Sequence, residues 1–394
     1  MKLKSKLMKR LALVPALLLA APAVAGAGTG SGAKFAPPME DPVAAEPASL
    51  CDQIFGIPTL YRNPDNPYIQ RFAIRGRYQG QYHYTDADTG TSEDWENRRI
   101  RFGADLDFLR DFSFETRWNV KRESGPGSLF EDVFTMSVTW KPSPEFHLQL
   151  GKQKANITNE WRTSSAAILT FERSLLVNTV IPETMWGARA GGNLGGFLYE
   201  ASVFTASVDN DQKFPDFKGG VGLHGSVGYD YAESAGLDRA VVRLDYFYQD
   251  GDADNNAVKP FRHVFSLNSA HVTGRFGLNT DLIYASGDGN VADVYGVVVM
   301  PYYDLLEKLR LVTRYTYAGG DGSSPLALTS RYERPAVQDG SSIRGDNYHS
   351  VYGGLNYYLC GDKLKLMAGA EYATMGGDSR YSGITWLGGV RLDF

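Results

Sequence analysis

The chain has 394 residues, a formal net charge of −5 at pH 7, 12% aromatic residues and 43 glycines. An acidic balance of this kind argues against a protein that binds nucleic acid or other acidic surfaces. After the N-terminal segment no stretch approaches about 18 consecutive apolar residues, so membrane-spanning helices are excluded from the rest of the chain.

Residues 1–25 have the three parts of a secretory signal peptide. Lys and Arg without any acidic residue precede an apolar run over residues 11–21, and Ala23, Val24 and Ala25 supply the small residues of a cleavage site. An N-terminal membrane anchor is the alternative, although the apolar run is short for a bilayer. We therefore expect a secreted protein whose remaining chain is more acidic than the whole sequence.

Residues 26–70 are rich in Ala, Pro and Gly and predict a flexible periplasmic lead-in, with a short ordered piece near residues 50–61. Strand-like alternation starts at residue 71. Phe72, Ile74 and Tyr78 share one face of this first strand, whereas Arg71, Arg75 and Arg77 share the other.

Sixteen segments with this alternation follow one another between residue 72 and Phe394. Each is long enough for a tilted strand that crosses a bilayer, and sixteen is even, as single-chain bacterial barrels require. The sequence thus predicts an all-β protein, a transmembrane antiparallel barrel over residues 71–394 in the outer membrane of a Gram-negative-type bacterium. A soluble secreted β-sandwich, whose strands also alternate, is the alternative.

The connections favour the barrel, because they alternate between short and long. We expect periplasmic turns at 110–111, 141–144, 193–196 and 360–362, and outer loops at 85–95, 154–184, 208–218, 250–259 and 319–345. The predicted partners are outer-membrane lipid and lipopolysaccharide, together with the barrel assembly machinery, which would bind the C-terminal strand that ends in Phe394. Outward aromatic residues such as Tyr82 and Trp386 suit the membrane interfaces.

Loop 154–184 is unusually apolar for an outer loop, with Trp161, Phe171, Leu175 and Leu176 among its side chains. Apolar content of this kind predicts burial. Folded into the barrel, the loop would present Arg162, Ser164, Ser165 and Arg173 to the passage and constrict it. A loop that packs over the barrel mouth or against a neighbouring subunit is the alternative.

Three stretches at and within this loop carry a family resemblance. They are residues 151–154 (GKQK), 161–165 (WRTSS) and 169–175 (LTFERSL), and they resemble the strand and constriction loop of the phosphate-selective porins O and P. The likeness extends more diffusely from Arg98 through the barrel to Phe394. It departs from the family pattern after Lys154, where Ala155, Asn156 and Ile157 stand in place of Pro and Phe.

The resemblance implies a homotrimeric sixteen-stranded channel with an inward third loop, through which small anions, phosphate or polyphosphate in particular, diffuse passively. By position in the motif it places the constriction and its anion-binding residues at Lys152, Lys154, Arg162, Ser164, Ser165 and Arg173. No catalytic activity, cofactor or nucleic acid is implied.

Inward positions of the first strands predict a basic lumen wall, made of Arg75, Arg77, Arg99, Arg101, Arg117 and Lys121. Arginine suits such a wall because its guanidinium stays charged and donates two hydrogen bonds to a phosphate. The predicted inward set also contains acids, namely Asp105, Asp107, Glu115, Glu131, Glu145, Glu200, Asp230, Asp245, Asp281 and Glu371. Paired charges in the lumen of a general diffusion porin for sugars and mixed ions are therefore the alternative.

Cys51 and Cys360 would both face the oxidising periplasm, where a disulfide that tethers the lead-in is feasible. Two unpaired thiols are the alternative. The six histidines have no metal-site spacing, and residues 250–254 (DGDAD) read as a solvated loop, with weak divalent-ion binding as the alternative. A barrel enzyme or an adhesive barrel remains a rival, although the outer loops hold few histidines for a catalytic group.

Overall fold

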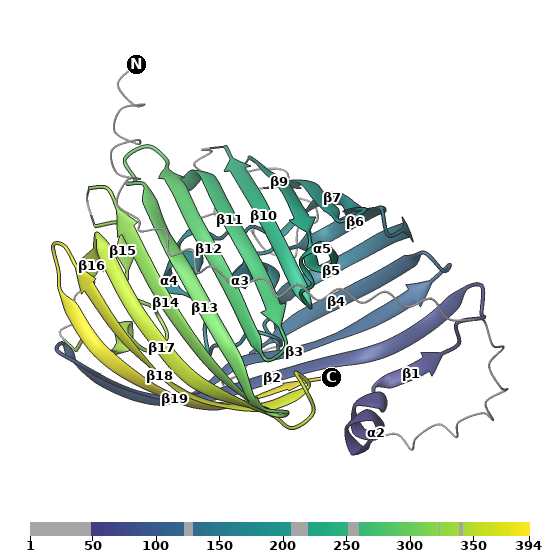
Figure 1. The fold of residues 1–394 in the computed structure, drawn as a ribbon, viewed down its shortest axis with the longest axis horizontal. Coiled ribbons are helices and arrows are strands. Elements are labelled where there is room, and N and C mark those ends of the chain that lie inside the picture. The colour runs from purple at the N-terminus through teal and green to yellow at the C-terminus, as the bar shows by residue number, and fades with distance from the viewer. Residues whose placement is uncertain (1–48, 122–128, 206–219, 251–259, 323, 339–341) are drawn as a thin grey trace, which may run out of the picture. The chain divides into compact units, whose positions relative to one another are not determined.

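The computed structural model describes residues 49–121, 129–205, 220–250, 260–322, 324–338 and 342–394. The predicted signal peptide, most of the lead-in and the loops at 208–218 and 251–259 lie outside these residues. Sixteen long strands dominate the described chain (Figure 1). They are β2 (Ile69–Ala87), β3 (Gly90–Phe108), β4 (Phe112–Val120), β5 (Phe130–Ser143), β6 (Phe146–Gln153), β7 (Met185–Leu194), β8 (Phe197–Thr205), β9 (Val221–Asp230), β10 (Arg239–Gln249), β11 (Phe261–Thr273), β12 (Phe276–Gly287), β13 (Val294–Leu306), β14 (Leu309–Gly320), β17 (Asn347–Tyr358), β18 (Leu364–Gly376) and β19 (Tyr381–Asp393).

Each of these strands pairs antiparallel with the next one in the chain, and β19 pairs with β2, where Trp386 lies opposite Tyr84. The sheet is therefore closed, and the prediction of a sixteen-stranded antiparallel barrel is confirmed. One predicted loop is wrong. Residues 85–95 continue the β2–β3 ladder, with Thr85 opposite Ser92, and the chain turns tightly at Asp88 and Thr89.

Alternation gives every strand two different faces. Along β17 the side chains of Tyr348, Ser350 and Tyr352 are buried, whereas His349 and Val351 between them are exposed. The exposed face of the barrel carries large apolar side chains such as Trp386, which is 55% exposed, as a surface in contact with lipid requires. Among the described residues no helix is long and apolar enough to cross a bilayer.

A short N-terminal strap precedes the barrel. It consists of α2 (Leu50–Gly56) and β1 (Thr59–Arg62), and β1 pairs with the first residues of β2. The Gly76 N–H of β2 donates to the Phe394 carbonyl, and the Ile74 N–H, two residues earlier in β2, donates to the Pro58 carbonyl. The strap therefore pairs with the same edge of β2 as β19 does, and its pairing begins where that of β19 ends. Gly76 leaves room there for the ring of Phe394, which a Cβ atom at position 76 would displace.

The predicted disulfide is present. Cys51 of α2 is bonded to Cys360 in the β17–β18 turn, with 5.6 Å between their Cα atoms. The disulfide holds the strap at the β17–β18 turn, and β1 holds it at β2. The strap is thus fixed on both sides of the seam, the place where the last barrel strand β19 pairs with the first barrel strand β2.

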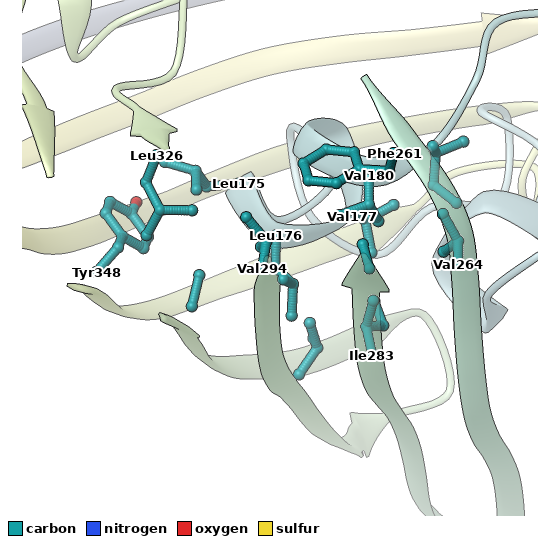
Figure 2. Packing of buried hydrophobic residues seen from close by; sticks show 14 of the residues in the cluster. Leu175, Leu176, Val177, Val180, Phe261, Val264, Ile283, Val294, Leu326 and Tyr348 are labelled. Atoms are coloured by element: carbon teal, nitrogen blue, oxygen red, sulfur yellow. The ribbon is translucent and has the colours of Figure 1, made fainter. Parts of the chain in front are cut away.

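Loop 154–184 contains α3 (Asn159–Arg162) and α4 (Leu175–Val180). In Figure 1 both helices lie behind β12–β14, and the contacts of α4 with β13 and β14 place it there. Its side chains Leu175, Leu176, Val177 and Val180 form a buried cluster with residues of the wall, including Phe261, Val264, Ile283 and Val294 (Figure 2). Burial of the loop's apolar side against β11–β13 is the physical reason that the loop holds this position.

A second long connection, loop 321–346, joins β14 to β17. It contains a small separate sheet of β15 (Leu326–Ala327) and β16 (Arg344–Gly345), and the 3₁₀ turn η2 (Arg334–Ala336). Leu326 packs into the same cluster as Leu175 (Figure 2). The two long loops therefore share one apolar core.

Candidate functional site

Between loop 154–184 and strands β2–β7 lies a cavity of about 470 Å³. Its lining is strongly basic, with ten cationic side chains against the two carboxylates Glu115 and Glu183 among the described residues. The cations are Arg77, Arg98, Arg99, Arg101, Arg117, Lys154, Arg162, Arg173, Arg189 and Arg331.

Helix α3 fixes the first part of the loop against β12. The Asp281 carboxylate accepts hydrogen bonds from the backbone N–H groups of Asn159, at 2.6 Å, and Glu160, at 3.2 Å. Thr158 caps the same helix by accepting from the Trp161 N–H. These bonds satisfy N–H groups that a helix start leaves without internal partners.

Glu160 connects the loop to the opposite wall. Its carboxylate accepts from Arg314 of β14 at 3.0 Å and from the Ser174 hydroxyl at 2.6 Å. Arg314 also donates to Glu371 of β18 at 3.1 Å, and all three charged side chains are nearly completely buried. Removing one member of such a buried group leaves an unpaired charge, so these residues fix the middle of the loop.

The far end of the loop is held by its backbone carbonyls. Asn356 donates to the Leu169 carbonyl at 2.9 Å, and Lys365 donates to the Ile168 carbonyl at 3.0 Å. Gln79 of β2 donates to the carbonyl of Ser165 at 2.7 Å. The loop thus runs from β6 past β12 and β14 to β17, β18 and β2.

Several of the cavity's cations have carboxylate partners. Arg162 pairs with Asp245 at 2.9 Å and with Glu200 at 3.5 Å, and Arg189 pairs with Glu200 at 3.3 Å. On the wall, Arg117 pairs with Asp105 at 2.7 Å and Arg77 pairs with Asp393 at 2.5 Å. Arg77 also donates to Ser165 and, more distantly, to Ser164.

A β-bulge adds another arginine to the wall. Gln79 lies opposite Arg99 while the next residue, Gly80, lies opposite Asn97, so Arg98 is an extra residue in β3. A bulge of this kind lets two consecutive side chains point to the same side of a strand. Arg98 and Arg99 both line the cavity, and Arg98 pairs with Glu172 of the loop through two hydrogen bonds.

Three cavity cations form no ion pair with a carboxylate among the described residues, and their hydrogen-bond partners are neutral. Arg101 donates to the Asn119 side chain at 2.7 Å and lies 3.4 Å from the centre of the Phe134 ring. Lys154 donates to the Trp161 carbonyl at 2.9 Å. Arg173 donates to the carbonyls of Glu160 and Thr163 at 2.9 and 2.8 Å.

Lys154 and Arg173 lie on loop 154–184, and their pKa values reflect this excess of positive charge. Burial, and then the neighbouring Arg173, Arg101 and Arg77, lower the pKa of Lys154 well below its usual value. Burial also lowers the pKa of Arg173 to about 10, against the opposing effect of Glu160. An anion in the cavity would relieve this repulsion.

Most of the residues predicted for the site meet at this cavity. Lys154, Arg162, Ser164, Ser165 and Arg173 line it from the loop, and Arg77, Arg99, Arg101 and Arg117 line it from the wall.

Three predicted residues do not line it. Arg75 lies nearer the periplasmic turn, paired with Asp105 at 2.6 Å. Lys121 lies exposed beyond the end of β4. Lys152 lies on the face of β6 opposite that of Gln149 and Gln153, which do line the cavity. The chain leaves the strand after Gln153, so Lys154 reaches the cavity although Lys152 does not.

The acids predicted on the inner face also fall into two groups, those bonded at the site and those away from it. Asp245, Asp281 and Glu371 are buried and Glu200 is half-buried, and all four are bonded to the loop or to residues that hold it. In β5 the strand irregularity makes Asp132, and not Glu131, the acceptor of the Asn119 side chain.

Two further acids of the predicted set lie away from the site. Glu145 lies in the β5–β6 turn and Asp230 at the end of β9, both exposed.

Sequence reasoning missed three cavity arginines. Arg98 is hidden by the bulge, because strict alternation places it on the lipid face. Arg189 follows the alternation of β7 and could have been found by extending the inward set to that strand. Arg331 belongs to loop 321–346, which carries no sequence signal for the β3 side of the barrel.

The family model of the phosphate-selective porins O and P matches residues 72–378. The chain belongs to this family. It is therefore an outer-membrane β-barrel of a porin family. A comparison with curated proteins finds no match to this porin.

Solved structures share the fold. OprB of Pseudomonas putida has 12% sequence identity and a TM-score of 0.60, covering 82% of this chain and 94% of its own. An anion-selective porin from Comamonas acidovorans has 12% identity and a TM-score of 0.58, covering 82% and 99%. The trimer form of OmpT from Vibrio cholerae has 13% identity and a TM-score of 0.53, covering 82% and 99%. At these identities the likeness concerns the fold.

Proposed function

We propose that this porin is a passive channel for small anions, in which loop 154–184 forms the constriction and the basic cavity selects the solute. The observation that carries the proposal is the group of Arg101, Lys154 and Arg173, three cavity cations that pair with no carboxylate among the described residues. Rings of Arg or Lys are how anion pores select. The transport involves no chemical reaction.

We further propose phosphate as the preferred anion, on the grounds of the family and of the guanidinium groups that gather at the cavity. Arginine donates two parallel hydrogen bonds to two oxygens of one phosphate, whereas a chloride ion or a single sugar hydroxyl offers only one acceptor atom. The family and the trimeric OmpT of Vibrio cholerae also support a homotrimer.

A general diffusion porin without phosphate preference is the second candidate. It is favoured by the number of cavity arginines that have carboxylate partners, such as Arg117 with Asp105 and Arg162 with Asp245. A passage whose charges are largely paired discriminates less between anions and neutral solutes.

The discriminating experiment is block of the chloride current of single channels by inorganic phosphate. We expect Arg101→Gln to weaken the block about tenfold or more, since a charge-assisted hydrogen bond contributes about 1.5–3 kcal/mol, whereas Arg101→Lys should retain part of it. Lys121→Gln, which removes an exposed cation outside the cavity, is the control. Absence of phosphate block in the wild-type channel would favour the second candidate.

A further inference from the structure

One cation of the cavity comes from a different part of the chain than the others. Among the described residues that line it, Arg331 belongs to loop 321–346, whereas every other one lies on β2–β7 or on loop 154–184. Two long loops that are remote in sequence therefore contribute charge to the same site.

Buried anchors hold the backbone next to Arg331. The Tyr332 hydroxyl donates to Glu371 at 2.8 Å, and the Tyr348 hydroxyl donates to Glu333 at 2.6 Å. Tyr332 and Glu333 are 2% and 1% exposed. Because these neighbours are fixed against β17 and β18, the position of Arg331 is defined even though its own side chain reaches water.

Arg331 pairs with Glu96 of β3, which marks its depth in the channel. β3 starts at Gly90, at the outer end of the barrel, and runs inward past Glu96 to Arg98, Arg99 and Arg101. At about 3.4 Å per residue, Glu96 lies roughly 15 Å above Arg101 along the strand. A solute that enters from outside thus reaches the Arg331–Glu96 pair before it reaches the cations of the wall.

The pair is in contact with water, unlike the buried ion pairs of Arg314 that hold the loop. The side chains of Arg331 and Glu96 are 32% and 20% exposed, whereas those of Arg314 and Glu160, which hold the loop, are 1% and 3% exposed. Partly exposed ion pairs contribute little and exchange partners easily, whereas breaking a buried pair is costly. An anion can therefore replace Glu96 on Arg331 while the loop anchors stay in place.

We propose that Arg331 and Glu96 form the outer entry gate of the anion site. An anion that arrives from outside replaces the Glu96 carboxylate on the Arg331 guanidinium and then moves inward to Arg98, Arg99 and Arg101. Glu96 competes for the same guanidinium and so sets the rate of entry from this side. This inference rests on the proposed function, because it concerns the regulation of the same cavity.

The test is the rate at which inorganic phosphate blocks single chloride channels when it is added to one side at a time. From the outer side, we expect Arg331→Gln to slow the block and Glu96→Gln to speed it, each about two- to fivefold, the range that a partly exposed pair can give. When phosphate is added from the periplasmic side, it should block both variants at the wild-type rate. Arg331→Lys should keep part of the outer rate, and Lys121→Gln is the matched control for loss of one cation.

The orientation of each channel is established with Glu307→Cys in the β13–β14 turn. This substitution adds a thiol that a bulky reagent can label, while both native cysteines are in the disulfide.

Equal effects of Arg331→Gln from the two sides, or an unchanged rate of block from the outer side, would overturn the proposed entry gate. If Arg101→Gln weakens the block while Arg331→Gln does not, the gate alone is wrong. If neither variant changes it, the proposed anion site is wrong as well.

Discussion

At the residue scale, the protonation state of Lys154 depends strongly on its surroundings. It follows the last residue of β6 and lies 5.1 Å from the Trp161 ring, whose other close cation is Arg173 at 4.7 Å. Burial and the neighbouring arginines favour its neutral form and lower its pKa. A bound anion favours the charged form instead, so proton binding at Lys154 and anion binding in the cavity strengthen each other.

This linkage predicts that anion affinity falls as pH rises through the lowered pKa of Lys154, below the range where an ordinary lysine loses its proton. Sulfate is the suitable probe, because its charge stays constant over this range. We expect sulfate block of the chloride current to weaken at a lower pH than that at which an ordinary lysine titrates, and Lys154→Arg to remove that dependence, since arginine stays protonated. A dependence that persists in the arginine variant would assign the titration to another group.

Glu333 gives a second prediction at this scale. Burial, and then the nearby Glu371, raise the pKa of Glu333 from 4.5 to about 7, while the hydrogen bonds from Tyr348 and Thr329 oppose this rise. Other titratable groups in contact with this pair are Tyr348, which donates to Glu333, and Tyr332 and Arg314, which both donate to Glu371. Because the pKa is higher in the folded loop, the stabilisation is fully present below about pH 4.5 and is lost as pH rises through about 7.

We therefore expect backbone amides of residues 326–338 to exchange hydrogen faster at pH 8 than at pH 5, after correction for intrinsic rates. Glu333→Gln keeps a side-chain acceptor for the Thr329 N–H and should abolish the difference. Equal protection of the wild-type loop at both pH values would contradict the pKa assignment.

At the element scale, the position of loop 154–184 depends on a few buried polar contacts and on the apolar cluster around α4. Glu160 joins Arg314 of β14 to Ser174 at the start of α4, so its loss disturbs both halves of the loop. The barrel strands are paired independently of this residue.

We expect Glu160→Ala to release the loop from β14. The single-channel conductance should rise and phosphate block should weaken, because breaking a buried ion pair costs about 3–5 kcal/mol. The heat stability of the barrel should change much less, since its strand ladder is intact. Glu93→Ala, which removes an exposed carboxylate of β3, is the control. Unchanged conductance in the Glu160 variant would show that the loop does not set the constriction.

The sequence predicts this element in part. Apolar residues such as Phe171 and Leu176 indicate that the loop is buried, and the alternation of β2 places Arg77 on the inner face. Neither signal reveals the β-bulge at Arg98, because an extra residue changes the register without a characteristic residue type. Arg331 reaches the cavity through tertiary contacts of loop 321–346, which a local pattern does not encode.

At the scale of the whole molecule, the N-terminal strap connects the seam of the barrel to its last turn. The Cys51–Cys360 disulfide joins residues that are 309 positions apart. A bond that closes a loop of this length restricts the unfolded chain strongly. The strap also pairs with β2 where β19 has ended, so it covers backbone groups that would otherwise form a free edge.

We expect Cys51→Ser with Cys360→Ser to lower the stability of the barrel by about 2–4 kcal/mol. The measurement is the temperature at which the folded band is lost on gel electrophoresis without prior boiling. Reduction of the wild-type protein should give a similar shift, whereas chloride conductance should not change, because the bond is remote from the cavity. An unchanged unfolding temperature would show that the bond is dispensable for the seam.

The molecule as a whole combines an acidic chain with a basic passage. The net charge of −5 belongs to the full sequence, whereas the cavity between loop 154–184 and strands β2–β7 gathers ten cations against two carboxylates. Ion preference follows the charge that lines the passage and not the total charge of the chain.

The reversal potential of the purified protein in a planar lipid bilayer under a potassium chloride gradient tests this claim most directly. We expect a potential of the sign that chloride permeation gives, and a shift toward zero for Arg101→Gln. A potential of the opposite sign, or one near zero in the wild-type channel, would contradict an anion-selective passage.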